Sequence, residues 1–151
     1  MKEMKVLLVD DEEEFVKTLS ERIKMRELKS DVALDGEQAL KKMDEDLPDV
    51  MVLDLKMPGI DGMEVLRRTK EAYPGVQIIM LTGHGSEEDE KEARRLGVFE
   101  YLQKPVELEK LIRTVTKAYK SKFESSMSAA AFAEAGDFNT ARKILEDEKK
   151  K

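Results

Sequence analysis

The sequence predicts an α/β domain in which helices cover both faces of a parallel sheet. Short apolar runs alternate with longer segments whose apolar residues recur at helical spacing, over roughly the first 120 residues. A second observation is that polar side chains stand where the apolar runs end. In an open parallel sheet these ends share one edge, which is where ligands bind.

Five segments are predicted as strands. Three continuous apolar runs, which end at Val9, Leu53 and Leu81, are each bounded by polar or turn residues. Such runs are typical of strands buried on both faces of a parallel sheet. Weaker candidates for two more strands are residues 32–34 and 99–103.

A helix is predicted after each strand. Phe15, Leu19 and Ile23 recur at four-residue spacing and predict the apolar face of the first helix. The apolar positions of the later helices are Ala39, Leu40 and Met43; Met63, Leu66 and Tyr73; Ala93 and Leu96; and Leu108, Leu111, Ile112, Val115, Ala118 and Tyr119. The fourth helix is predicted to end at Gly97, a residue type that suits the C′ position.

Composition narrows the classes of protein and partner. The 151 residues suffice for one domain with a short appendage, and the net charge of −6 argues against nucleic acid as a partner. There is no cysteine, which excludes disulfides and thiolate metal sites and fits a reducing cytoplasm. No signal peptide and no apolar stretch of about 18 residues is present, so we expect a soluble, cytoplasmic protein without a membrane partner.

The polar residues at the run ends suit a divalent cation beside a phosphoryl group. Asp10 and Asp11 follow the run that ends at Val9, and Asp54 follows the run that ends at Leu53. Carboxylate oxygens are the hard ligands that Mg²⁺ takes, and a cation relieves their mutual repulsion, so that one aspartate could attack phosphorus. Thr82 and Lys104 end the last two runs and could contact phosphate oxygens.

From about residue 4 to residue 120, the chain resembles the receiver domain of two-component response regulators. The motifs that carry the resemblance are Val-Asp-Asp-Glu at 9–12, Asp-Leu-Lys-Met-Pro-Gly at 54–59 with Asp-Gly at 61–62, Leu-Thr-Gly-His-Gly at 81–85 and Tyr-Leu-Gln-Lys-Pro at 101–105. The resemblance implies a receiver domain over residues 1–120 with a five-stranded flavodoxin-like (βα)5 fold of strand order 2-1-3-4-5. It implies a phosphorylation-controlled switch and not an enzyme.

The resemblance also implies the roles of the site residues. Asp54 is implied as the phosphoacceptor, and Asp11, Asp54 and the backbone carbonyl of Lys56 as direct Mg²⁺ ligands, with Asp10 acting through water. The phosphoryl donor is implied to be a sensor histidine kinase or a phosphotransfer protein.

Three further residues are implied to report phosphorylation. Thr82 and Lys104 are the expected phosphate-sensing pair, and Tyr101 is the expected aromatic side chain that changes rotamer when Thr82 moves. The peptide bond from Lys104 to Pro105 is expected to be cis.

Residues 121–151 are predicted to form a C-terminal helical hairpin that resembles a single tetratricopeptide-type unit. One such unit cannot bury its own apolar face, so three arrangements stay open: docking on the receiver, homodimerisation, or binding of a partner. The chain could also be a fragment of a longer protein. The segment carries six cations and six anions and is too short for a typical DNA-binding domain, so we expect output through contacts with an unknown downstream protein.

Two alternative functions stay open. One is a Mg²⁺-dependent phosphatase with an aspartyl phosphate, but such enzymes carry a second aspartate two residues after the nucleophile, where this chain has Lys56. The other is a scaffold that keeps the fold without being phosphorylated. The complete set of site residues argues against it.

Overall fold

A single parallel sheet with a helix after each strand forms the described part of the chain. The computed structural model describes the backbone of residues 4–134 and the side chains of residues 4–122. Its elements are β1 (Lys5–Val9), α1 (Glu13–Lys24), β2 (Lys29–Ala33), α2 (Gly36–Glu45), β3 (Val50–Leu53), α3 (Gly62–Ala72), β4 (Gln77–Thr82), α4 (Glu87–Arg95), β5 (Glu100–Gln103) and α5 (Leu108–Glu134). All pairings are parallel, in the order β2-β1-β3-β4-β5, which confirms the predicted fold class and the strand order that the resemblance implied.

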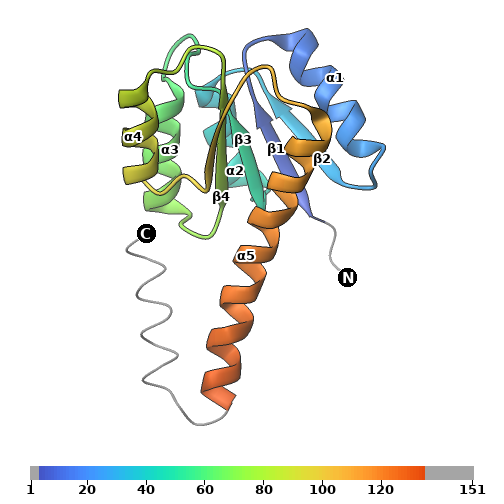
Figure 1. Cartoon of the computed structure of the whole chain (residues 1–151), viewed down its shortest axis with the longest axis vertical. Coiled ribbons are helices and arrows are strands. Elements are labelled where there is room, and N and C mark those ends of the chain that lie inside the picture. The colour runs from blue at the N-terminus through green and yellow to red at the C-terminus, as the bar shows by residue number, and fades with distance from the viewer. Residues whose placement is uncertain (1–3, 135–151) are drawn as a thin grey trace.

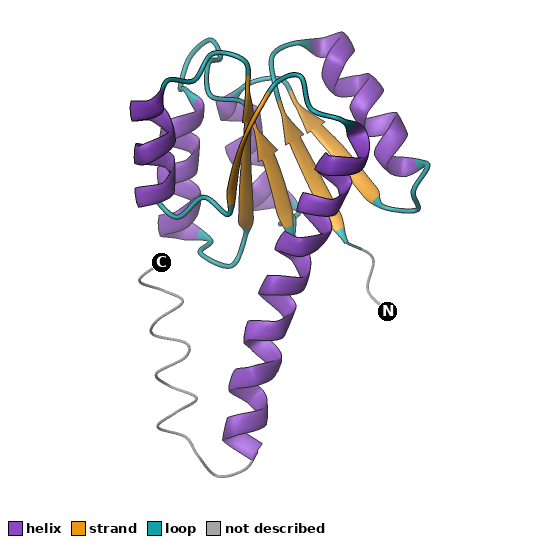
Figure 2. Cartoon of the chain, viewed as in Figure 1, coloured by secondary structure: helices purple, strands orange, loops and turns teal. Residues whose placement is uncertain are grey.

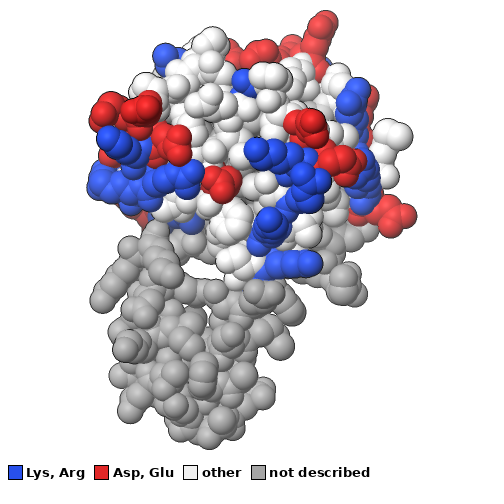
Figure 3. Space-filling model, in the orientation of Figure 1, with Lys and Arg blue, Asp and Glu red and all other residues white. Residues whose placement is uncertain are grey.

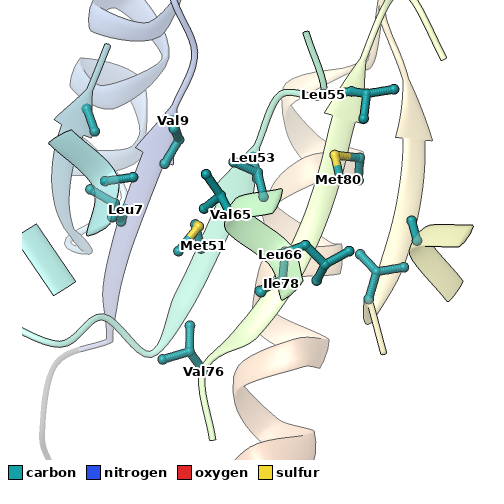
Figure 4. Close-up of a cluster of buried hydrophobic side chains, with 14 of the residues drawn as sticks. Leu7, Val9, Met51, Leu53, Leu55, Val65, Leu66, Val76, Ile78 and Met80 are labelled. Carbon is teal, nitrogen blue, oxygen red and sulfur yellow. The ribbon is translucent and has the colours of Figure 1, made fainter. Parts of the chain in front are cut away.

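Alternate residues of the strands divide the core into two clusters, one on each face of the sheet. Leu7, Met51 and Ile78 belong to the cluster that packs against α2, α3 and α4 (Figure 4). Val6 and Val52 belong to the cluster that packs against α1 and α5. Figure 1 shows α5 crossing in front of the sheet and α2 behind it. Both faces are therefore covered, which is why the central strands read as continuous apolar runs.

Side chains at the loop ends fix where three helices begin. Asp35, Asp61 and Ser86 each accept a hydrogen bond from the backbone N–H three residues later, at the starts of α2, α3 and α4. At α4 the bond is reciprocated in a capping box between Ser86 and Asp89. Gly97 has φ of +98° after the end of α4, which confirms the predicted C′ glycine.

Two predictions about the first helix and the second strand need correction. The second strand covers Lys29–Ala33 and not 32–34, and it lies at the edge of the sheet, where Lys29 and Asp31 face solvent. Its sequence therefore lacks the apolar run that marks the central strands. Phe15 was predicted on the apolar face of the first helix, but its side chain is 38% exposed, whereas Leu19 and Ile23 are buried as predicted.

Helix α5 is the longest element of the described chain. It runs from Leu108 to Glu134 without a break at the predicted boundary between residues 120 and 121, and it continues past the lower edge of the sheet in Figure 1. Lys122 ties its middle to the sheet through an ion pair with Asp49, at 3.2 Å. The division into 1–120 and 121–151 stays a prediction, because the rest of the predicted hairpin, residues 135–151, lies outside the described residues.

The loops at the carboxyl ends of the strands gather along one edge of the sheet, at the top of Figure 2. On the surface that Figure 3 shows, basic and acidic side chains are interspersed. Arg94 forms ion pairs with Glu90 and Glu100, each at 3.0 Å. Among the helices in the described part of the chain, none is long and apolar enough to cross a membrane.

Candidate functional site

Asp10 and Asp54 lie at the carboxyl edge of the sheet because the backbone ladder continues one residue past each strand. The N–H of Asp10 donates to the carbonyl of Ala33 at 3.1 Å, and the N–H of Asp54 donates to the carbonyl of Val9 at 2.9 Å. In the same way, the N–H of Lys104 donates to the carbonyl of Thr82 at 3.0 Å. The sheet itself therefore positions the backbone of three predicted site residues.

Three carboxylates gather at this edge. Oxygens of Asp10, Glu12 and Asp54 all lie within 4.8 Å of one another. Asp54 is 3% exposed and Asp10 is 4% exposed, whereas Glu12 is open to solvent. The structure thus brings together two of the predicted acids.

Asp11 was predicted in this cluster, but it is exposed and the structure places Glu12 there instead. A carboxylate oxygen of Asp10 accepts a hydrogen bond from the N–H of Glu12 at 2.9 Å, which turns the chain back over the sheet edge. Glu12 is the site residue that the sequence reasoning missed, although it stands in the Val-Asp-Asp-Glu motif. The role of Asp11 as a Mg²⁺ ligand stays a prediction.

Lys104 brings a positive charge into the carboxylates. Its Nζ lies 2.7 Å from Asp10 and 3.0 Å from Glu12, and 4.6 Å from the centroid of the Phe15 ring. Burial pulls the pKa of Lys104 down, but the hydrogen bonds to Asp10 and Glu12, with the charges of Asp10 and Asp54, outweigh it and raise the pKa. The side chain of Lys104 therefore stays protonated. Its contact with the ring of Phe15 makes Phe15 a neighbour of the site and not part of the core.

Asp54 is the carboxylate whose charge is least favoured. Burial is the main cause that raises its pKa, and the nearby charge of Asp10 acts in the same direction. The charge of Lys104, the hydroxyl of Thr82 and the backbone N–H of Leu55 oppose this without cancelling it; the N–H of Leu55 lies 2.8 Å from the carboxylate. A buried carboxylate whose charge is disfavoured in this way is stabilised when a cation binds beside it.

The remaining predicted site residues surround this group. Thr82 is fully buried at the end of β4, and its Oγ1 accepts a hydrogen bond from the N–H of His84 at 3.2 Å. The side chain of Lys56 is exposed, and the role of its carbonyl stays a prediction. The peptide bond from Lys104 to Pro105 is cis, as the resemblance implied.

Tyr101 lies on β5 with its side chain only 6% exposed, on the same sheet face as α4. Its hydroxyl is buried and has no hydrogen-bond partner among the described residues. Burial is the main cause that raises the pKa of Tyr101, followed by the charges of Asp89 and Glu90. Tyr101 thus lies on the strand next to that of Thr82 and is not part of the charged cluster.

The donor set fits a hard divalent cation. Asp10, Glu12 and Asp54 offer oxygen ligands and no sulfur or nitrogen, which is the chemistry that Mg²⁺ prefers. The Nζ of Lys104 supplies positive charge to two of the same carboxylates. The site therefore suits Mg²⁺ beside a phosphoryl group.

Comparison with known proteins gives one consistent result. Residues 6–116 match the family model of the response regulator receiver domain. A putative NtrX-like response regulator of Rickettsia conorii is 34% identical over 120 residues, which are 78% of this chain and 25% of that protein. The alkaline phosphatase synthesis transcriptional regulatory protein PhoP of Bacillus subtilis is 38% identical over 101 residues, which are 67% of this chain and 42% of that protein.

A solved structure agrees with these sequence relatives. The crystal structure of a response regulator receiver domain protein from Clostridium thermocellum is 31% identical, has a TM-score of 0.75, and covers 79% of this chain and 96% of that one. The chain thus spans nearly all of a solved receiver domain but less than half the length of the two curated relatives.

Proposed function

The chain belongs to the response regulator receiver domain family, and on that premise we propose that it is a phosphorylation-controlled switch in which Asp54 accepts the phosphoryl group. The observation that carries the proposal is the meeting of Asp10, Glu12, Asp54 and Lys104 at one edge of the sheet. Asp54 is the most deeply buried of the three acids and the one whose pKa is raised. An acyl phosphate on Asp54 keeps negative charge at this position, and Lys104 and a bound Mg²⁺ would neutralise it.

The proposed reaction is a transfer between two side chains. A carboxylate oxygen of Asp54 forms a bond to phosphorus while the phosphorus–nitrogen bond of a donor phosphohistidine breaks and the imidazole leaves. The ammonium of Lys104 is placed to contact the phosphoryl oxygens, and the hydroxyl of Thr82 to donate a hydrogen bond to them. The product is an acyl phosphate on Asp54.

Asp10, Asp54, the carbonyl of Lys56 and either Asp11 or Glu12 would hold Mg²⁺. When bound, this ion supplies positive charge that neutralises the carboxylates and the phosphoryl oxygens. Calorimetric Mg²⁺ titration of Asp11→Asn and Glu12→Gln variants decides which of these two acids is a ligand of the ion. The family predicts the larger loss of affinity for the first variant, and the observed cluster predicts it for the second.

We further propose that the chain does not turn over external phosphoesters. The position two residues after Asp54 carries Lys56, whose exposed ammonium cannot act as the carboxylate acid–base group of an aspartyl-phosphate phosphatase. Steady release of inorganic phosphate from an added phosphoester, dependent on Asp54, would contradict this.

The proposed donor is a sensor histidine kinase or a phosphotransfer protein in the cytoplasm, and it docks beside α1. A groove of about 390 Å³ lies between α1 and α5, lined by Phe15, Thr18, Val106 and Leu108 among others. It adjoins the site, because the ring of Phe15 lies 4.6 Å from the Nζ of Lys104. A Thr18→Arg variant should lose transfer from the protein donor but keep labelling by a small phosphodonor.

For output we propose contacts with a downstream protein or with a second copy, and not with nucleic acid. Residues 121–151 carry six cations and six anions, so they add no net positive charge that DNA could attract. Light scattering of the whole chain with and without beryllium fluoride tests the second copy. A change of mass on addition of beryllium fluoride supports dimerisation as the output, and an unchanged mass leaves the downstream protein as the output.

The direct test of the proposed function is labelling with a small phosphodonor such as acetyl phosphate. We expect Mg²⁺-dependent addition of one phosphoryl group, stable to acid and labile to base, detected by intact mass. The Asp54→Ala variant should not be labelled, while an Asp61→Ala variant serves as a matched control, because Asp61 caps α3 nearby and is exposed. Equal labelling of the Asp54→Ala variant would overturn the assignment.

A further inference from the structure

Gly85 lies where a side chain cannot coexist with the observed position of Tyr101. A Cβ atom built on Gly85 would stand 1.6 Å from the hydroxyl oxygen of Tyr101 and 2.9 Å from its Cζ. The same atom would be 3.0 Å from Cγ2 of Thr82. One position in the loop after β4 therefore limits the space of Tyr101 and Thr82, two of the three residues that the resemblance implies report phosphorylation.

The need for glycine here is steric and does not come from the backbone. Among the described glycines only Gly59 and Gly97 have positive φ values, so no left-handed backbone conformation requires a glycine at residue 85. Gly83, two residues earlier in the same loop, provides a contrast. A Cβ on Gly83 would meet nothing closer than Cβ of Lys104 at 3.8 Å, an ordinary contact.

The buried position of Tyr101 is incompletely satisfied. Its hydroxyl has lost water and gains no hydrogen bond from the described residues, which makes burial of the phenol less favourable than burial of its ring alone. The apolar contacts of the ring thus favour the buried position of Tyr101, and the missing hydrogen bond of its hydroxyl disfavours it. The orientation of Tyr101 is therefore determined mainly by which neighbouring atoms leave room for its ring.

We infer that Gly85 is a positioning residue that permits the buried orientation of Tyr101 and links its position to that of Thr82. A methyl group at residue 85 displaces the tyrosine ring toward solvent. A movement of Thr82 toward a phosphoryl group on Asp54 changes the same space. The inference rests on the proposed function only for this last link, since the steric relation between Gly85 and Tyr101 is independent of phosphorylation.

Fluorine NMR of the whole chain labelled with 3-fluorotyrosine tests this inference. The chain has three tyrosines, so the spectrum contains three resonances, and a Tyr101→Phe variant identifies that of Tyr101. In the wild type we expect a Tyr101 resonance that shows no solvent isotope shift, as for a buried ring. In Gly85→Ala it should acquire the isotope shift of an exposed ring, whereas in Gly83→Ala it should not.

A double-mutant cycle covers the case in which Gly85→Ala folds poorly. In a Tyr101→Leu background no atom occupies the position of the hydroxyl, so Gly85→Ala should lower the urea midpoint much less, with only the 3.0 Å approach to Cγ2 of Thr82 remaining. An equal loss of midpoint in both backgrounds, or a Tyr101 resonance that stays buried in Gly85→Ala, would overturn the inference.

The link to phosphorylation has its own readout. Beryllium fluoride should move the Tyr101 resonance of the wild type but not that of Gly85→Ala, while acetyl phosphate still labels Asp54 in both. An unlabelled Asp54 in the wild type rejects the proposed function and leaves the steric result standing. A labelled Asp54 with equal responses of Tyr101 in both proteins rejects the link through Gly85.

Discussion

Replacing Asp54 by asparagine should make the protein more stable at neutral pH. Asp54 is 3% exposed, and an oxygen of Asp10 lies within 4.8 Å of its carboxylate. Asparagine has nearly the same shape, can still accept the hydrogen bond from the N–H of Leu55, and carries no charge. The variant therefore keeps the packing and removes a buried like-charge repulsion.

The size of the effect follows from opposing charges. Two unit charges about 4.8 Å apart repel by roughly 3 kcal/mol at an effective dielectric constant of about 20. The attraction of Lys104 and the hydroxyl of Thr82 offset part of this, although burial adds to it. We expect a net gain of about 1–2 kcal/mol in the free energy of unfolding, which corresponds to a rise of roughly 3–8 °C in Tm.

The pH dependence gives the reasoning a second check. The folded-state pKa of Asp54 is raised above its unfolded value, so its ionisation destabilises the fold above the folded pKa and has no effect below the unfolded pKa. The stability difference between the variant and the wild type should therefore be largest near neutral pH. It should shrink as the pH falls through the pKa of Asp54, because a protonated carboxyl resembles the amide.

Urea denaturation at several pH values, without Mg²⁺, measures this difference. Asp61→Asn is the matched control: Asp61 is an exposed N-cap, asparagine caps equally well, and its stability should stay within error of the wild type at every pH. An Asp54→Asn variant that is no more stable than the wild type at neutral pH would refute the electrostatic account of the site. So would a stability gain that persists unchanged in acid.

Three further predictions concern the fold that holds the site. Gly62→Ala should cost about 2–3 kcal/mol and abolish labelling by acetyl phosphate, because a Cβ there would stand 2.1 Å from the backbone oxygen of Asp54. Ser86→Ala should cost about 1 kcal/mol and speed amide exchange in α4, because the capping box is lost. Asp49→Ala should cost about 1–3 kcal/mol in urea denaturation, because its carboxylate accepts the N–H of Lys5 at 2.9 Å and pairs with Lys122 at 3.2 Å.

Each of these changes has a control in the chain. Gly75→Ala should be tolerated, since its Cβ would meet nothing closer than Cε of Lys122 at 4.0 Å. Ser86→Thr should keep the cap, and Lys122→Met should lose only the ion pair and so cost less than the loss of Asp49. Normal labelling of Gly62→Ala by acetyl phosphate would contradict the argument from the Cβ contact. Unchanged amide exchange in Ser86→Ala would contradict the argument from the capping box. Equal losses of unfolding free energy in Asp49→Ala and Lys122→Met would contradict the argument from the hydrogen bond to Lys5.

Much of the site could be predicted from the ends of the apolar runs. Asp10, Asp54, Thr82 and Lys104 each follow or end a strand, and parallel pairing in register brings such ends to one edge whatever the loops do. The strand order itself came from the resemblance. Alternation of strands and helices allows several orders, and nothing in the local pattern of residues selects one.

The sequence could not show how the chain leaves the sheet. Side-chain alternation predicts directions along a strand, but it stops at the bend after Asp10, and so Glu12 takes the place expected for Asp11. Helical periodicity assigned Phe15 to a buried face, yet the first turn of α1 stands beside the sheet edge, where the ring meets Lys104. The buried face predicted for Phe15 is wrong and Glu12 was not foreseen, and both residues lie where local periodicity ends and tertiary position decides. The metal-ligand role of Asp11 stays a prediction.

The backbone hydrogen bonds that hold Asp10, Asp54 and Lys104 in the sheet have a consequence for how the site loses its structure on unfolding. Asp10 and Asp54 follow the central strands β1 and β3, so their amide hydrogens should exchange with solvent only when the whole domain opens, whereas Lys104 follows the edge strand β5. The two aspartates cannot drift apart through a local breathing motion of the loops. Any ion or phosphoryl analogue that binds them must therefore raise the melting temperature of the entire domain, and a thermal melt becomes a binding assay for the site.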